Sequence, residues 1–177
     1  MMRRSHLLIA AVAAMLAAPA IGQQGVGSGL KNHDTNAPID IGAERIEVND
    51  RASRAIVSGS VDVRQGRLRL QAERVTVAYA PSGDNAIERI DATGGVVITS
   101  PTETIRGNTG IYDLRAKIIT LMGNVSLRNP DGNLNGGRLV YDLRTGRAVL
   151  DGGAPGAPGS GSSTTGRVTG RFTVPQT

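Results

Sequence analysis

Residues 59–79 read GSVDVRQGRLRLQAERVTVAY, and this run determines the expected architecture. It opens on the phrase Gly-x-Val-x-apolar, closes on a tyrosine, and recurs twice further along the chain. The glycine-led copies are Gly59–Val63, Gly94–Ile98 and Gly123–Leu127, and the closing tyrosines are Tyr79, Tyr112 and Tyr141. Such self-similarity indicates stacked supersecondary units that share one core. A stack of this kind predicts a long sheet-walled surface, which suits an elongated ligand better than chemistry at a point.

Apolar residues alternate with polar ones throughout the region from Pro38 to Asp151, which predicts strands with one buried face. Turn-forming residues separate these runs at intervals typical of a sandwich, a jelly roll or a solenoid, and no amphipathic helix of useful length interrupts them. The fold class expected from this pattern is all-β. The alternating runs are Ile39-x-Ile41, Ile46-x-Val48, Val61-x-Val63, Leu68-x-Leu70, Val75-x-Val77, Val96-x-Ile98, Ile119-x-Leu121, Val125-x-Leu127, Leu139-x-Tyr141 and Ala148-x-Leu150.

The predicted core is built of branched aliphatic residues with very few rings. The whole chain has three tyrosines, one phenylalanine and no tryptophan, whereas a domain of this size usually fills its centre with several aromatics. This composition fits an interior left partly open for flexible chains, and it fits a thin, well-packed β-solenoid equally well.

The two ends of the chain have compositions unlike the centre. Residues 1–20 resemble a secretory signal, with Arg3-Arg4 followed by an apolar run and the small-x-small site Ala18-Pro19-Ala20. A retained membrane anchor is the alternative. We expect residues 21–37 to be a flexible leader and the Gly/Pro/Ser-rich residues 152–166 to be a linker. Residues 167–177 are either a frayed tail or an edge strand, because Val168, Gly170 and Phe172 alternate with polar residues.

The sequence offers little for catalysis or for metal and cofactor binding. There is no cysteine, and His33 is the single histidine after the predicted signal, so thiol chemistry is excluded and a Ser-His-Asp site lacks a rigidly held base. We therefore expect no enzyme activity, no catalytic residue, no metal and no cofactor. The basic strands interleaved with aromatics that nucleic-acid platforms use are also missing.

A basic cluster surrounds one predicted turn. Arg64, Arg67 and Arg69 flank Gln65-Gly66, and guanidinium groups bind phosphate well. The sequence makes them candidate phosphate contacts; the alternative is a hairpin tip whose like charges stay in water. The net charge of the chain is +5, which favours anionic partners and equally serves solubility.

These motifs together carry a family resemblance. The run from Pro38 to Val48, followed by the pattern Gly-x-Val, Gln-Gly, Ala-acid and Tyr over residues 59–79, resembles the OstA-like family of periplasmic lipopolysaccharide-transport bridge proteins (LptA type). Gly136-Gly137 stands where the earlier copy has Ala72-Glu73, so the resemblance weakens toward the C-terminus.

The resemblance implies a twisted antiparallel β-jelly roll that does not close completely. It implies a periplasmic carrier whose apolar interior shields the acyl chains of lipid A, and which assembles head to tail. The implied partners are lipopolysaccharide, the periplasmic jelly-roll subunit of the inner-membrane transporter and the periplasmic domain of the outer-membrane translocon. The alternatives are a membrane-anchored partner of the same pathway and a structural β-solenoid or assembly protein that binds no lipid.

The incompletely closed sheet that the resemblance implies leaves two edges, and parity along the strands predicts which side chains face the groove. The expected edge-strand residues are Ile39, Ile41, Ala148 and Leu150. The expected groove residues share one face of their strands and are Ile46, Val48, Val61, Val63, Leu68, Leu70, Val75, Val77, Val96, Ile98, Leu121, Val125, Leu127 and Leu139. Because a one-residue slip in register turns every side chain of a strand to the other face, each strand's prediction holds or fails as a unit.

Overall fold

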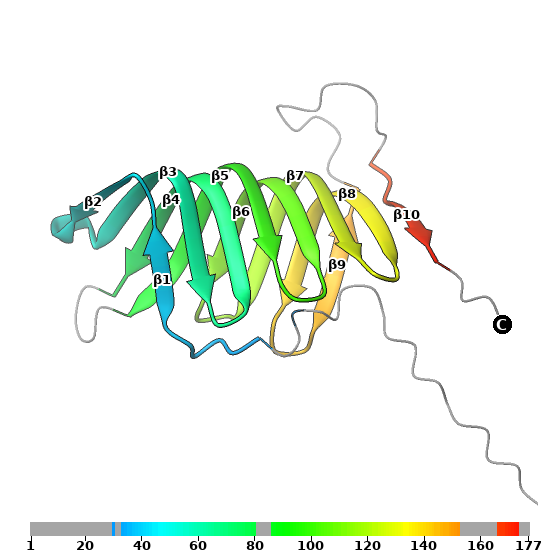
Figure 1. The fold of residues 1–177 in the computed structure, drawn as a ribbon, viewed down its shortest axis with the longest axis horizontal. Helices are drawn as coiled ribbons and strands as arrows, with labels where there is room; N and C mark the ends of the chain where they lie inside the picture. The colour runs from blue at the N-terminus through cyan, green and yellow to red at the C-terminus, as the bar shows by residue number, and fades with distance from the viewer. Residues whose placement is uncertain (1–29, 31–32, 81–85, 153–165, 174–177) are drawn as a thin grey trace, which may run out of the picture.

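The protein is a single bent antiparallel sheet, seen in a computed structural model that describes residues 30, 33–80, 86–152 and 166–173 (Figure 1). The predicted signal, most of the predicted leader and most of the predicted linker lie outside these residues. No helix among the described residues is long and apolar enough to cross a membrane. The elements are β1 (Ile39–Gly42), β2 (Arg45–Asn49), the 3-10 helix η1 (Asp50–Ala52), β3 (Arg54–Gln65), β4 (Leu68–Tyr79), β5 (Ile87–Thr99), β6 (Thr104–Asp113), β7 (Ile118–Asn129), β8 (Gly132–Asp142), β9 (Arg147–Asp151) and β10 (Thr169–Phe172).

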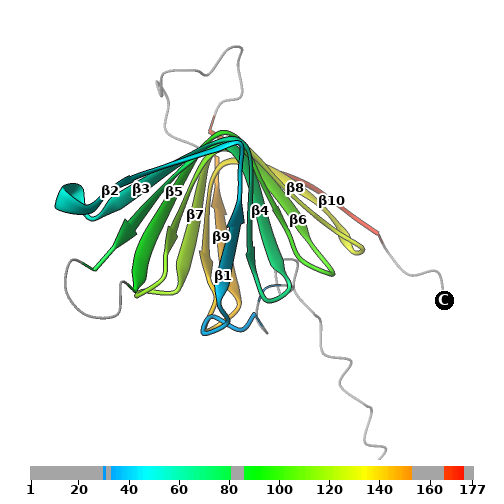
Figure 2. The same cartoon turned by 60° about the vertical axis from the view of Figure 1, so that its left-hand side comes forward.

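The long strands β3 to β8 pair in chain order, so each strand lies beside its sequence neighbours. Every one of them bends near its middle, which divides the sheet into two walls that meet along one line, as the turned view shows (Figure 2). The β1 wall begins with β1 on β3 and ends with β10 on β8. The β2 wall begins with β2 on β3 and ends with β9 on β8. The expected all-β, incompletely closed jelly roll is confirmed.

The recurring Gly-x-Val phrase forms the bend. In each copy the glycine and the residue after it both have positive φ: 80° and 47° at Gly59-Ser60, 84° and 81° at Gly94-Gly95, and 78° and 49° at Gly123-Asn124. The pairing register shifts at these points, which is the signature of β-bulges that kink a strand. Glycine opens the phrase because its φ value excludes most side chains.

Strand length is where the structure departs from the sequence prediction. The runs Leu68–Leu70 and Val75–Val77 are two halves of β4, since residues 73 and 74 both face solvent at the bend and shift the alternation by one. β7 likewise joins two predicted runs. In each copy the strand continues through the Gly-x-Val phrase and passes from one wall to the other there.

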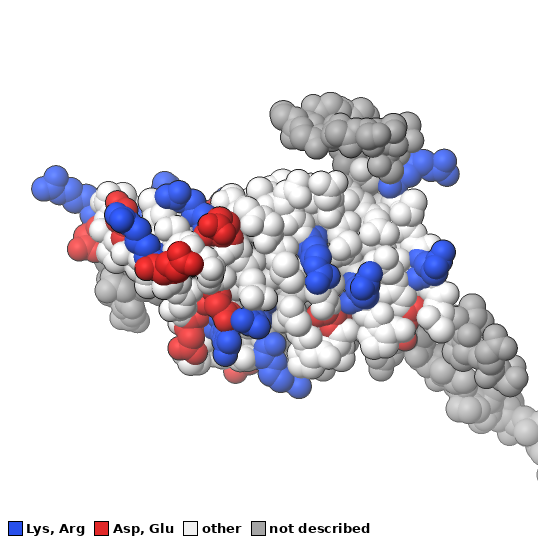
Figure 3. Space-filling view, turned by 45° about the horizontal axis from the view of Figure 1, so that its top comes forward, with Lys and Arg blue, Asp and Glu red and all other residues white. Residues whose placement is uncertain are grey.

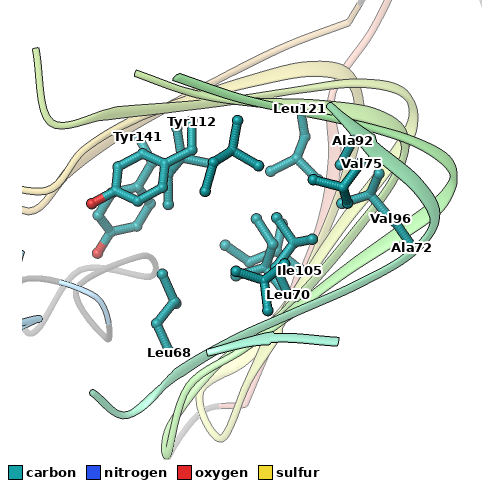
Figure 4. Close-up of a cluster of buried hydrophobic side chains, with 14 of the residues drawn as sticks. Leu68, Leu70, Ala72, Val75, Ala92, Val96, Ile105, Tyr112, Leu121 and Tyr141 are labelled. Carbon is teal, nitrogen blue, oxygen red and sulfur yellow. The ribbon is translucent and has the colours of Figure 1, made fainter. Parts of the chain in front are cut away.

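The space between the walls is filled for most of its length. Near the bend the side chains are small or branched, as at Ala72, Val75 and Val96, and toward the open side they are longer, ending in Tyr112 and Tyr141 (Figure 4). A cavity of about 20 Å³ remains beside Leu68 and Leu70, which has room for about one water molecule. The composition allowed either a partly open interior or a well-packed one, and the centre of this sheet is well packed.

The interior opens at the N-terminal end of the sheet. A cavity of about 340 Å³ lies there between β2 and the β2-wall halves of β3, β4 and β5, and Ile46, Val48, Val57 and Val77 line it. Ile46 is 56% exposed and Val48 61% exposed, so they differ from the other predicted groove residues: they face inward but stand at an open mouth.

Candidate functional site

The candidate site is the groove between the two walls. All of the predicted groove residues except Ile46 and Val48 are buried in it. The two walls contribute different halves of the strands, with Val63, Leu70 and Leu127 on the β1 wall and Val75 and Leu121 on the β2 wall. The groove is therefore an apolar layer that runs across the sheet from β2 to β9.

The side of the groove opposite the bend is an open rim, and a buried glutamine organises it. Gln65 ends β3 on the β1 wall and is 4% exposed. Its Oε1 accepts a 3.1 Å hydrogen bond from the hydroxyl of Tyr112, which stands on the β2 wall. Its Nε2 donates to the backbone carbonyls of Thr35 and Ala37, at 3.0 and 3.1 Å. Gln65 thus ties both walls to the segment that precedes β1.

That segment lies along the open rim below the sheet (Figure 1). His33 Nε2 lies 2.9 Å from Gln65 Oε1. Further along, the backbone N–H of Leu30 donates a 3.0 Å hydrogen bond to the hydroxyl of Tyr141, and the Leu30 side chain is only 1% exposed within the core cluster. Leu30 and residues 33–37 therefore contact the groove, where the sequence predicted a flexible leader.

The two rim tyrosines sit in an apolar environment that disfavours their charged form. Burial raises the pKa of Tyr112 to about 12. Burial also raises the pKa of Tyr141 to about 12; the Leu30 hydrogen bond opposes this rise, and the negative charge of Glu103 on the opposite wall adds to it. Both hydroxyls remain neutral hydrogen-bonding groups at physiological pH.

The predicted phosphate contacts lie at the tip of the hairpin between β3 and β4, on the rim of the β1 wall. Asp62 already engages two of them: its carboxylate accepts hydrogen bonds from Arg69 at 2.9 and 2.7 Å, and from Arg64 at 3.4 and 3.0 Å. These bonds, with Arg69 the stronger partner, hold the pKa of Asp62 at about 2. Arg67 is exposed and makes none of the ion pairs found among the described residues.

Charge is distributed unevenly over the outer face. Acidic and basic side chains mix over the N-terminal end of the sheet, while the basic side chains over the C-terminal half have few acidic neighbours (Figure 3). The described residues contain no cluster of three or more histidine, aspartate or glutamate side chains that could hold a metal ion.

The predicted edge residues occupy the outermost strands. Ile39 and Ile41 lie in β1, and Ala148 and Leu150 lie in β9. Among the described strands, β1 pairs with β3 alone and β9 with β8 alone. All four are half-buried against the core. The tail also provides a strand, since β10 pairs with β8 on the β1 wall. Each end of the sheet therefore presents two short strands, one on each wall.

Sequence reasoning missed several groove residues. Val57, Ile90, Ala92, Ile105 and Ile119 are all at most 2% exposed. β6 gave no sequence signal because glycines at 107 and 110 occupy its inward positions on either side of the bend. The rim contacts of Gln65 and the tyrosines join residues far apart in the chain, so only the recurrence of Tyr112 and Tyr141 pointed to them.

Comparisons with known proteins agree with this architecture. The sequence pattern of the family described as "LptA/(LptD N-terminal domain) LPS transport protein" matches residues 40–147. An uncharacterised protein of Rhizobium meliloti (strain 1021) is 33% identical over 125 residues, which cover 66% of this chain and 67% of that protein.

A solved structure shares the fold. It is LptH of Pseudomonas aeruginosa, described as the LptA-homologous periplasmic component of the conserved lipopolysaccharide transport device. The two superpose with a TM-score of 0.65 at 21% identity, covering 80% of this chain and 99% of LptH. Since the matched pattern spans most of the bent sheet, this chain belongs to the LptA/LptD N-terminal domain family of lipopolysaccharide-transport proteins.

Proposed function

We propose that this protein carries lipopolysaccharide across the periplasm by holding the acyl chains of lipid A between its two walls. The proposal is based on the continuous apolar layer between the walls, which is open to solvent at its N-terminal mouth. Each CH₂ group removed from water contributes about 0.8 kcal/mol, so a lipid with several long chains crosses an aqueous space only inside such a layer.

The walls must separate to admit a lipid. A cavity of about 20 Å³ at the centre holds no acyl chain, whereas the mouth of about 340 Å³ has room for the end of one. Along the bend the walls are joined by the backbone of every long strand, but along the rim they meet through side chains such as Gln65 and Tyr112. Loading therefore widens the rim while the bend stays closed.

The charged end of the lipid stays outside, at the rim. Arg67 is the best placed of the three candidate phosphate contacts, because Arg64 and Arg69 are held by Asp62. A phosphate that binds Arg64 or Arg69 must compete with that carboxylate. Arg67 then contributes the direct phosphate contact, and the other two arginines raise the local positive potential.

Export and assembly complete the proposal. A signal cleaved after about Ala20 delivers the chain to the periplasm, and the four outer strands join neighbours by strand addition. β1 and β2 form one joining edge, and β9 with β10 forms the other. Head-to-tail self-association and docking to the jelly-roll domains of the inner- and outer-membrane machinery use the same two edges.

Photocrosslinking in cells tests the carrier role. A photoreactive residue at the inward position Val75 should capture lipopolysaccharide, while the same residue at the adjacent outward position Thr76 should not. At β1 and β9 it should capture neighbouring jelly-roll domains. If position 75 captures no lipid while the edges still capture protein, the chain is an assembly module without lipid cargo.

A further inference from the structure

The segment on the rim occupies the place that the proposed function gives to the lipid. Leu30 puts an aliphatic side chain into the apolar core at 1% exposure. Its backbone amide donates to Tyr141, and two carbonyls of the same segment accept from Gln65. The groove thus already holds an apolar side chain with amide groups on either side of it, and the N-terminal segment of the protein itself supplies them.

The contacts of the segment are few, and apart from those of Leu30 they lie at the rim of the groove. Between His33 and Ala37 the described side chains are half-buried or exposed, and the segment is held chiefly through Gln65. Leu30 is its single fully buried described residue. An element anchored by one apolar side chain and a few hydrogen bonds can leave without unfolding the sheet, whose strands pair independently of it.

We propose that Leu30 together with residues 33–37 is a displaceable strap that closes the empty groove, and that an amide-linked acyl chain replaces it. This inference rests on the proposed function. The incoming chain takes the place of the Leu30 side chain. Its amide group then meets the hydroxyl of Tyr141 and the side-chain amide of Gln65, which lose their strap partners at the same moment, so no buried polar group is left unpaired.

The strap has two consequences for a carrier. Without cargo it covers apolar surface that would otherwise promote aggregation. When lipid is present, the strap competes with it for the groove. A ligand that binds only the strap-free state binds with a lower apparent affinity, because only a fraction of the molecules is in that state. The strap therefore favours release as well as protection, which suits a protein that must pass its lipid onward.

Equilibrium binding of fluorescently labelled lipid A to the full mature chain tests the strap. Leu30→Asp should release it, because the carboxylate is stable in water and costly in the core, and the released groove should bind lipid about tenfold more tightly. Val149→Asp is the matched control: it puts the same charge on the exposed outer face of β9 and should leave binding unchanged. Circular dichroism confirms that both variants keep the sheet.

A second measurement follows the strap directly. The chain has no cysteine, so Asn36→Cys gives one defined site for a spin label on the exposed side of the strap. The label should be restrained in the empty protein and become mobile when lipid A saturates the groove. An N-acylated glucosamine should mobilise it at lower concentration than a free fatty acid of the same chain length, since only the former presents an amide.

The outcomes separate the two proposals. If the chain binds lipid A but the label stays restrained and Leu30→Asp binds no more tightly, the segment is a fixed part of the fold and the strap proposal is wrong. If neither the native chain nor the variants bind lipid A, the carrier function itself fails, and the strap proposal fails with it.

Discussion

The bend and the open rim hold the same two walls together by different means. At the bend the connection is covalent, repeated in every long strand, and shaped by backbone angles that glycine accepts. At the rim it consists of side-chain hydrogen bonds around Gln65 and a short segment anchored by Leu30. One side of the groove is thus fixed by the backbone, while the other side depends on contacts that a ligand can replace.

This difference assigns separate roles to the two regions. Substitutions at the bend should act on folding, since they change the backbone path of a strand. Substitutions at the rim should change the fold little. They should have a larger effect on lipid binding and on the pH dependence of stability.

Two adjacent glycines at one bend provide the strongest test. A Cβ at Gly94 would stand 2.5 Å from the Cβ of Glu73, while a Cβ at Gly95 meets nothing within 4 Å, although the φ values are 84° and 81°. Gly95→Ala should lower the free energy of unfolding by about 1–2 kcal/mol from backbone strain alone. Gly94→Ala should lower it by a further 1–3 kcal/mol or so, because the side chain is overpacked. Urea denaturation measures both, and equal losses would contradict the close approach at the bend.

Alkaline pH should weaken the rim. The pKa of Tyr112 and of Tyr141 is about 12 in the folded protein and about 10 in an unfolded chain. The folded state therefore holds these protons more tightly, and stability is complete below pH 10 and falls as the pH rises through 12. The expected loss is about 2–3 kcal/mol for each ring. Urea denaturation at pH 8 to 12 measures it.

Tyr112→Phe is the control for that titration. It should cost about 1 kcal/mol at pH 8, because it removes the hydrogen bond to Gln65. Between pH 10 and 12 it should lose less stability than the native chain, since one titrating group is gone. Parallel curves for the two proteins would show that Tyr112 does not titrate with the raised pKa.

Asp62, which pairs with Arg64 and Arg69, should give a smaller change of stability with pH. The folded pKa of Asp62 is about 2 against an ordinary value of 3.8, so its stabilisation is present above pH 4 and is lost as the pH falls through 2. Because its arginine partners are 44% and 60% exposed, we expect about 1 kcal/mol or less. Asp62→Asn should flatten the pH dependence of the free energy of unfolding between pH 4 and 2, as measured by urea denaturation.

The tail should matter least for stability. All four residues of β10 are exposed, so a chain ending at Gly152 should lose no more than about 0.5–1 kcal/mol. Its removal frees the edge of β8 at residues 132–135, and light scattering should then detect more self-association. A loss of several kcal/mol would instead place β10 within the cooperative unit of the fold.

The sequence predicts the walls better than the rim. Alternation identified inward side chains in both halves of β4 and β7 and in one half of β3, β5 and β8, because those half-strands keep a period of two. The Gly-x-Val phrase was recognised as a repeat, but its role as a bulge required the φ values and the register shifts. β6 was missed since glycines replace its inward side chains near the bend.

The rim could not be predicted because its partners are distant in the chain. Leu30 and Tyr141 are 111 residues apart, and Gln65 and Tyr112 are 47 apart. No local pattern encodes such pairs. The polar, glycine-rich composition before Pro38 is also typical of a flexible leader, so no local pattern marks Leu30 as a buried residue.

The proposed loading requires the walls to separate at the rim while each wall keeps its shape. Pulsed electron paramagnetic resonance tests it with pairs of spin-labelled cysteines in this cysteine-free chain. The pair Thr102 and Thr145 spans the rim from the β5–β6 turn to the β8–β9 turn, and the pair Gln71 and Arg128 lies within the β1 wall. When lipid A binds, the first distance should increase and the second should stay constant. If lipid binds and neither distance changes, the walls do not separate at the rim during loading.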